Sequence, residues 1–208
     1  MLVDISERRQ AETQQRLLLD ELNHRTKNNM QMLQSLLFCA ARTAHSEEAR
    51  KVLKEASARI AAMAAAQRVL YGRSDASHFA AEEFLPAVCE TIRQLLPDAR
   101  IECGIARGVL SNDVAMPLAL ILNELLTNAV KHGVKDHARQ GVRVNLTGEG
   151  GRLALCVEDD GEGFDLEEVR KTSSGLQLVL GLARQLHGTL YVTKNPSRAC
   201  LDFPAAKI

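Results

Sequence analysis

Residues 1–71 contain neither Pro nor Gly, and their apolar positions recur with the period of an α-helix. This pattern predicts two long helices, each with one apolar stripe. The stripe of the first helix contains Leu19, Leu22, Met30, Leu33, Leu37 and Ala40, and that of the second contains Val52, Leu53, Ala56, Ile60, Met63 and Leu70.

The segment "RTAHS" separates the two helices. Ser46 is suited to cap the second helix, with Glu47 and Glu48 in its first turn, and Gly72 is suited to end it. Two helices joined by so short a loop form an antiparallel hairpin. Because one hairpin with two apolar stripes buries little by itself, we expect two chains to form a dimeric four-helix bundle.

After the linker-like "GRSDASH" the pattern changes to one of alternating helices and strands. We predict helices at 82–96, 117–132 and 176–187. Strands are predicted at 100–105, 142–147, 153–158, 190–193 and 198–203, with turns at "GEGG" and "KNPS". The fold class is therefore α+β, with an α/β sandwich in which helices cover one face of a mixed sheet. The expected divisions are a connector helix (1–18), the hairpin (19–72), a linker (73–80) and the sandwich domain (81–208).

The amino-acid composition limits which kinds of molecule this protein is expected to bind and where it is expected to be located. Lys plus Arg equals Asp plus Glu at 26 each, so no net charge favours nucleic acid. The five cysteines lack a CxxC pair, which argues for a reducing compartment and against a disulfide framework or zinc site. No apolar run approaches the roughly 20 residues of a membrane span, and the N-terminus lacks a signal-peptide core. We expect a cytoplasmic protein without a membrane span.

The stretch "DELNHRTKNNMQML" places His24 opposite the apolar stripe of the first helix, so its side chain should be exposed. Asp20, Glu21 and Asn28 lie within one turn of it. An imidazole whose second nitrogen donates to a carboxylate is a candidate nucleophile. The helix by itself leaves a solvated polar face with an incidental histidine as an alternative.

A second polar set lies on the mostly apolar segment "LILNELLTNAVKHG". Glu124, Asn128, Lys131 and His132 are spaced so that they share one face of a helix. Polar groups on a buried helix need partners. An amide oxygen can bind Mg²⁺, and a lysine can neutralise phosphate. An amphipathic helix with a polar outer face is the simpler alternative.

Two short motifs follow. In "CVEDDGEGFD", Asp159 ends a strand and is followed by Gly161 and Gly163, which allow a ligand to approach the backbone closely. In "SSGLQLVL", Ser174 and Gly175 open a helix whose N-terminal amides can bind phosphate. Each motif alone also describes an ordinary turn.

In this order, the motifs resemble the ATP-binding domain of sensor histidine kinases and of their gyrase and Hsp90 relatives, the GHKL-type ATPases. The N box is Asn123–His132, and the first glycine box is Asp159–Gly163. The second, around Ser173–Gly175, has Ser173 where the branch often has glycine. "ELNHRTKNNMQMLQSLL" is similar to the phosphoacceptor box of the HWE kinases and their HRxxN sister families, through His24, Arg25 and Asn28.

The resemblance implies a role for each matching residue. ATP and Mg²⁺ are the implied cofactors, with Asn128 as the Mg²⁺ ligand and Glu124 supporting the metal or a general base. Lys131 and His132 would meet the phosphates, and Asp159 the adenine. The same boxes add Asn123, Gly161, Gly163, Ser174, Gly175 and Leu176 to the nucleotide site. His24 would accept the phosphoryl group, with Glu21, Arg25 and Asn28 beside it.

The expected function is therefore that of an ATP-dependent protein histidine kinase of a two-component system. It would form a homodimer through the hairpin and pass the phosphoryl group to an aspartate of a response-regulator receiver domain. The segment 2–15 resembles a connector that follows a PAS-like sensor, which this chain does not contain. The alternatives are a phosphotransfer or phosphatase scaffold with a vestigial ATP site, and a related GHKL ATPase or serine kinase.

Overall fold

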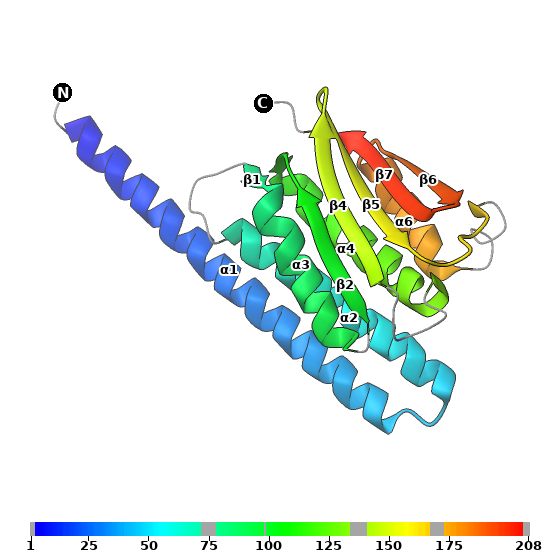
Figure 1. The fold of residues 1–208 in the computed structure, drawn as a ribbon. Coiled ribbons are helices and arrows are strands. Elements are labelled where there is room, and N and C mark those ends of the chain that lie inside the picture. The colour runs from blue at the N-terminus through cyan, green and yellow to red at the C-terminus, as the bar shows by residue number, and fades with distance from the viewer. Residues whose placement is uncertain (1–2, 72–77, 98, 134–140, 167–172, 206–208) are drawn as a thin grey trace.

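The computed structural model describes residues 3–71, 78–97, 99–133, 141–166 and 173–205. The chain begins with a hairpin of two long helices, α1 (Val3–Thr43) and α2 (Glu47–Tyr71) (Figure 1). Ser46 caps α2 as predicted, since its Oγ accepts a hydrogen bond from the Ala49 amide at 3.1 Å. The predicted linker falls mostly on residues outside the described ranges, but its last three residues form a short strand, β1 (His78–Ala80).

The second part of the chain is built on a five-stranded mixed sheet with the strand order β2-β4-β5-β7-β6. Its strands are β2 (Arg100–Ala106), β4 (Gly141–Glu149), β5 (Arg152–Asp159), β6 (Thr189–Lys194) and β7 (Ser197–Pro204). β2 and β4 are parallel and the other neighbours are antiparallel. A separate pair, β1 and β3 (Val109–Ser111), was not predicted as strands.

Three helices cover one face of this sheet, as the sequence predicts: α3 (Ala81–Leu95), α4 (Asn112–Asn128) and α6 (Ser174–Gln185) (Figure 1). A π-helical turn, η1 (Ala129–Gly133), continues α4. The predicted start of α4 at Pro117 is five residues too late, because Pro117 lies inside the helix. The core includes Phe84, Leu118, Leu122, Leu155, Leu176 and Phe203, all without exposed surface.

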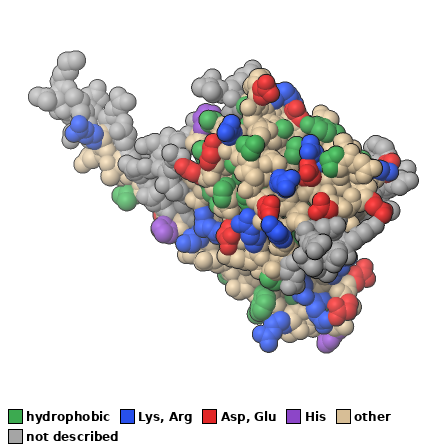
Figure 2. All heavy atoms as spheres, viewed as in Figure 1, with side chains coloured by type: hydrophobic (Ala, Val, Ile, Leu, Met, Phe, Trp, Pro, Cys, Tyr) green, Lys and Arg blue, Asp and Glu red, His purple; other side chains and the backbone are tan. Residues whose placement is uncertain are grey.

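The other face of the sheet is polar and charged. Arg143, Glu158 and Arg198 lie side by side across β4, β5 and β7, where both arginines pair with the glutamate. Figure 2 shows basic and acidic side chains interspersed over the face of the molecule seen in that view. Such a mixed surface needs no further layer of protein to cover it.

The hairpin buries a face of α2 against the second part of the chain, which we did not predict. Ala62, Ala65 and Ala66 of α2 are fully buried in the same core as α3 and α4. By contrast, Leu22 and Leu33 of α1, which the sequence assigns to the bundle core, are 59% and 45% exposed in the single chain. α2 therefore packs against the sandwich domain mainly through residues outside its predicted stripe, whereas α1 keeps the apolar surface that the expected four-helix bundle would bury.

The prediction of cysteines without a disulfide is wrong for one pair. Cys156 of β5 and Cys200 of β7 are direct cross-strand partners and form a disulfide. The positions of the cysteines in the sequence do not predict this disulfide, because the pairing depends on the register of the two strands.

The segment Asn112–His132 is long and apolar enough to span a membrane by length and composition. Since 61% of its most apolar window is buried in the fold, it is the core helix α4 with η1.

Candidate functional site

The predicted N box lies where α4 and η1 pass between the sheet and α2. Its polar residues differ in burial: Asn123 and Glu124 are buried, Asn128 is half-buried, and Lys131 and His132 are exposed. The Asn123 side chain donates to Glu124 Oε1 at 3.2 Å. Its own Oδ1 is buried and has no hydrogen-bond partner among the described residues. A buried amide oxygen without a partner suits a ligand atom or ion that arrives from outside the protein.

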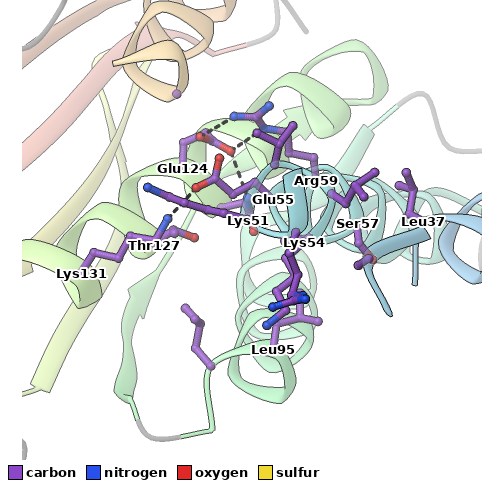
Figure 3. Close-up of a pocket in the computed structure, with 18 of the residues that line it drawn as sticks. Leu37, Lys51, Lys54, Glu55, Ser57, Arg59, Leu95, Glu124, Thr127 and Lys131 are labelled. Atoms are coloured by element: carbon purple, nitrogen blue, oxygen red, sulfur yellow. Dashed lines mark hydrogen bonds and ion pairs between the residues drawn. The ribbon is translucent and has the colours of Figure 1, made fainter. Parts of the chain in front are cut away.

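Glu124 is bound by a residue that the sequence analysis did not single out. Arg59 of α2 donates from Nε to Glu124 Oε1 at 2.9 Å and from a terminal nitrogen to Oε2 at 3.1 Å. Figure 3 shows the two side chains meeting between α2 and α4. The glutamate side chain is only 10% exposed, and the arginine 28%. This two-point pairing raises the pKa of the Arg59 guanidinium above its ordinary value, although its burial opposes the rise.

The same carboxylate also contacts the second glycine box. A Cβ atom added at Gly175 would overlap Glu124 Oε2, so this position requires glycine while the carboxylate stays in place. The sequence predicted Glu124 and Gly175 in one site, and the structure brings them into contact.

A second ion pair joins α2 to the N box. Lys131 Nζ lies 2.8 Å from Glu55 Oε1 (Figure 3). The hydrogen bond from Lys131 lowers the pKa of the Glu55 carboxyl below its ordinary value, and burial opposes this shift. Two of the residues assigned to ATP chemistry, Glu124 and Lys131, are thus held by α2. Glu55 and Arg59 are one helical turn apart, but nothing in their spacing connects them to partners 76 and 65 residues away.

Five of the other predicted residues line a cavity of about 450 Å³ beside β5 and α6. Its lining includes Asn128, His132, Asp159, Gly163 and Leu176. Asp159 accepts a hydrogen bond from the Gly161 amide at 2.8 Å, which orients its carboxylate at the end of the strand. The cavity therefore combines apolar surface with convergent polar groups, as small-ligand sites do.

Glycine and serine positions shape the edges of this cavity. Gly163 has a φ of +67°, and a Cβ there would lie 2.8 Å from the Lys194 Cα, so a side chain is excluded. Ser173, which replaces a family glycine, caps α6 by accepting a hydrogen bond from the Leu176 amide at 3.3 Å. Ser174 is exposed beside it and lines a larger open cleft of about 1460 Å³ between the hairpin and the N box.

The predicted phosphoacceptor segment lies on α1. His24 and Asn28 are exposed, as the helical pattern predicted. Arg25 Nε lies 2.8 Å from Glu21 Oε1, so the arginine contacts the acid that the sequence analysis placed beside His24. His24 lines neither cavity. The first α1 residue at the open cleft is Leu37, thirteen positions after His24, or about 20 Å along a helix.

These features define a class: a helical hairpin joined to an ATPase sandwich of the histidine kinase and gyrase type. Comparison with known families agrees. Residues 21–96 match the histidine kinase family, and residues 113–206 match the histidine kinase-, DNA gyrase B- and HSP90-like ATPases. The chain belongs to the sensor histidine kinases, in the branch of HWE type.

Relatives of the whole core support this assignment. Sensor histidine kinase PdtaS of Mycolicibacterium smegmatis is 32% identical over 190 residues, 85% of this chain and 37% of the relative. Blue-light-activated histidine kinase 1 of Erythrobacter litoralis is 26% identical over 189 residues, 89% of this chain and 51% of the relative. The chain thus spans about a third to a half of these relatives.

A solved structure shares the fold. The histidine kinase domain of the Erythrobacter litoralis EL346 blue-light activated histidine kinase superposes with a TM-score of 0.62 at 18% identity. The match covers 84% of this chain and 96% of that domain. At this identity the likeness concerns the arrangement of the hairpin and the sandwich domain.

Proposed function

We propose that this chain is the catalytic core of a two-component histidine kinase, which transfers the γ-phosphoryl group of ATP to His24. The observation that carries the proposal is the meeting of the N box and both glycine boxes around one site, joined to a hairpin that presents an exposed histidine. The cavity beside Asp159 would hold the adenine, and Lys131, His132 and Ser174 would face the phosphates.

Mg²⁺ fits the two asparagines of the N box: Asn123 Oδ1 is buried and has no partner within the described part of the chain, and Asn128 lines both the cavity and the cleft. Asn128 would hold the ion, with Glu124 as support. When bound, the ion would offset the charge that develops on the phosphates. A hard cation with oxygen ligands agrees with the amide and carboxylate groups at this position.

In the proposed reaction, an imidazole nitrogen of His24 forms a bond to the γ-phosphorus as the bond to ADP breaks. The ring's proton passes to Glu21 or to water. Arg25 holds the Glu21 carboxylate within one turn of the histidine, and Asn28 would contact the phosphoryl oxygens. A receiver-domain aspartate of a response regulator would then take the phosphoryl group from the exposed face of α1.

The separation of His24 from the nucleotide site is part of the proposal. While α2 holds Glu124 and Lys131, His24 lines neither the cavity nor the cleft. Transfer therefore requires the hairpin to move relative to the ATPase domain, or a second chain to supply its own His24. The exposed apolar residues of α1 would form the contact with that second chain.

The test is labelling with γ-labelled ATP and Mg²⁺. We expect label that survives alkali and is lost in acid, as expected of a phosphohistidine. It should disappear in His24→Ala and persist in His45→Ala, which removes an exposed histidine at the hairpin loop. Unchanged labelling of His24→Ala would refute the assignment. Failure of the wild type to bind a fluorescent ATP analogue would favour a scaffold with a vestigial site.

A further inference from the structure

A group of ionisable side chains that the proposed kinase reaction does not use lies where α3 packs against β2, away from the N box (Figure 1). It contains two free cysteines, Cys89 of α3 and Cys103 of β2, whose thiols are close enough for each to shift the pKa of the other. Cys89 has no exposed surface, whereas Cys103 is half-buried on an edge strand of the five-stranded sheet. An oxidant from solvent therefore meets Cys103 first.

An arginine holds a positive charge at the accessible thiol. Arg93 lies one turn after Cys89 on α3, and a terminal nitrogen of its guanidinium lies 3.5 Å from Cys103 Sγ. The guanidinium is fixed by two other bonds, from Nε to the Ile101 carbonyl at 2.9 Å and from the other terminal nitrogen to Glu90 at 3.1 Å. A cation anchored in this way stabilises a thiolate without depending on the thiolate for its own position.

The two thiols are consequently unequal. Hydrogen bonding from Cys89, together with the charge of Arg93, lowers the pKa of Cys103 to about 7, although burial and Glu90 oppose the shift. The hydrogen bond to Cys103 and burial raise the pKa of Cys89 above its ordinary value. One sulfur is thus reactive and accessible, and the other is a buried thiol within reach of it, the arrangement of a redox-sensing pair.

We propose that Cys103 and Cys89 form a peroxide-sensitive thiol pair, with Cys103 as the reacting cysteine and Cys89 as the resolving cysteine. The Cys103 thiolate attacks one oxygen of hydrogen peroxide, the O–O bond breaks, and sulfenic acid and hydroxide form. The Cys89 sulfur then bonds to the Cys103 sulfur, the S–O bond breaks, and water leaves with the thiol proton. The two thiols together lose two electrons and two protons, and one peroxide becomes two waters.

The disulfide would join α3 to the edge strand β2. A disulfide requires an S–S distance of about 2.05 Å, which we expect the two thiols to reach by side-chain rotation. The residues after Cys89 on α3, including Ile92 and Leu95, line the open cleft next to the N box. The disulfide would therefore be attached to α3, the helix whose C-terminal residues line the cleft next to the N box.

The experiment uses the full chain with Cys39→Ser, which removes the exposed free cysteine. After treatment with hydrogen peroxide and alkylation, a non-reducing peptide map should contain a Cys89–Cys103 peptide pair with two hydrogens fewer than the separate peptides. In Cys89→Ser, Cys103 should be trapped as sulfenic acid by dimedone. In Cys103→Ser, Cys89 should stay reduced. If both thiols remain free, or if Cys103 oxidises without joining Cys89, the proposal is overturned.

A second measurement does not depend on oxidation. The iodoacetamide rate of Cys103 should rise with pH through a midpoint near 7, giving roughly tenfold more thiolate at neutral pH than an ordinary cysteine has. Arg93→Gln should slow the reaction at pH 7 by up to about tenfold. A midpoint at or above the ordinary value for cysteine would overturn the proposal. Circular dichroism of each variant checks folding, and no outcome depends on phosphoryl transfer.

Discussion

The pairing between Arg59 and Glu124 allows a quantitative test of how α2 is held on the ATPase domain. Replacing Arg59 with Gln removes two charge-assisted hydrogen bonds, at 2.9 and 3.1 Å, from a carboxylate whose side chain is only 10% exposed. The Asn123 amide remains as a partner of one oxygen. The variant therefore leaves a nearly buried charge with one neutral donor, which is the costly way to break such a pair.

Breaking a fully buried pair costs about 3–5 kcal/mol, and the partial exposure of Arg59 reduces this figure, so we expect a loss of about 2–3 kcal/mol in the free energy of unfolding. The assay is urea unfolding followed by circular dichroism. Glu47→Gln is the matched control, because it removes an exposed ion pair within the same helix. Its effect should stay below about 0.5 kcal/mol.

A double-mutant cycle isolates the pair from general damage. The cycle combines Arg59→Gln, Glu124→Gln and the double variant, and the coupling energy should exceed about 1 kcal/mol. Additive losses, with a coupling below about 0.5 kcal/mol, would show that the ion pair does not hold α2 in place.

The Arg59→Gln variant also tests whether phosphoryl transfer to His24 is blocked while α2 is packed against the ATPase domain. Because Arg59→Gln loosens α2 without removing any proposed catalytic group, labelling of His24 should become faster while binding of a fluorescent ATP analogue is retained. Slower labelling at unchanged nucleotide affinity would refute the reasoning, since it would make the docked α2 the competent arrangement.

Three further predictions concern the borders of the site. Gly175→Ala puts a methyl group against the Glu124 carboxylate, so affinity for a fluorescent ATP analogue should fall at least tenfold, and unchanged affinity would contradict the contact. Ser173→Ala should lower the free energy of unfolding by about 1 kcal/mol, whereas Ser173→Gly should cost a few tenths. Because Lys131 lowers the pKa of Glu55 in the folded chain, the stability from this pair is present above pH 4.5 and is lost as pH falls through the lowered pKa. The difference between wild type and Glu55→Gln in urea unfolding should therefore shrink with acidification, and a constant difference would count against the pair.

Much of this architecture could be predicted because local pattern and tertiary structure agree. The period of the apolar positions located both helices of the hairpin, and Ser46 marked the start of α2 with the cap that the structure contains. The glycine pair at 150–151 marked the turn between β4 and β5, where both residues have positive φ. These features depend on neighbours in sequence, so the chain alone specifies them.

The contacts that could not be predicted depend on register and on docking between distant segments. Cys156 meets Cys200 only because β5 and β7 pair in one particular register. Arg59 meets Glu124 only because one face of α2 packs on α4, whereas we expected the apolar residues of α2 to lie in the core of a dimeric four-helix bundle. Apolar periodicity shows that a helix face will be buried and does not identify the surface that buries it.

The interface between α2 and the ATPase domain combines two weak contributions, and this bears on how the core would work. Ala62, Ala65 and Ala66 are fully buried and contribute only about 2–3 kcal/mol, and Val69 and Leu70 add a partly buried apolar contact. The ion pairs of Glu55 and Arg59 add attraction that is largely offset by the desolvation of their charges. An interface of this size can open without unfolding the domain. If the proposed transfer within one chain takes place, the hairpin has to carry His24 to the nucleotide, and such an interface would allow this movement, whereas a larger apolar contact would oppose it.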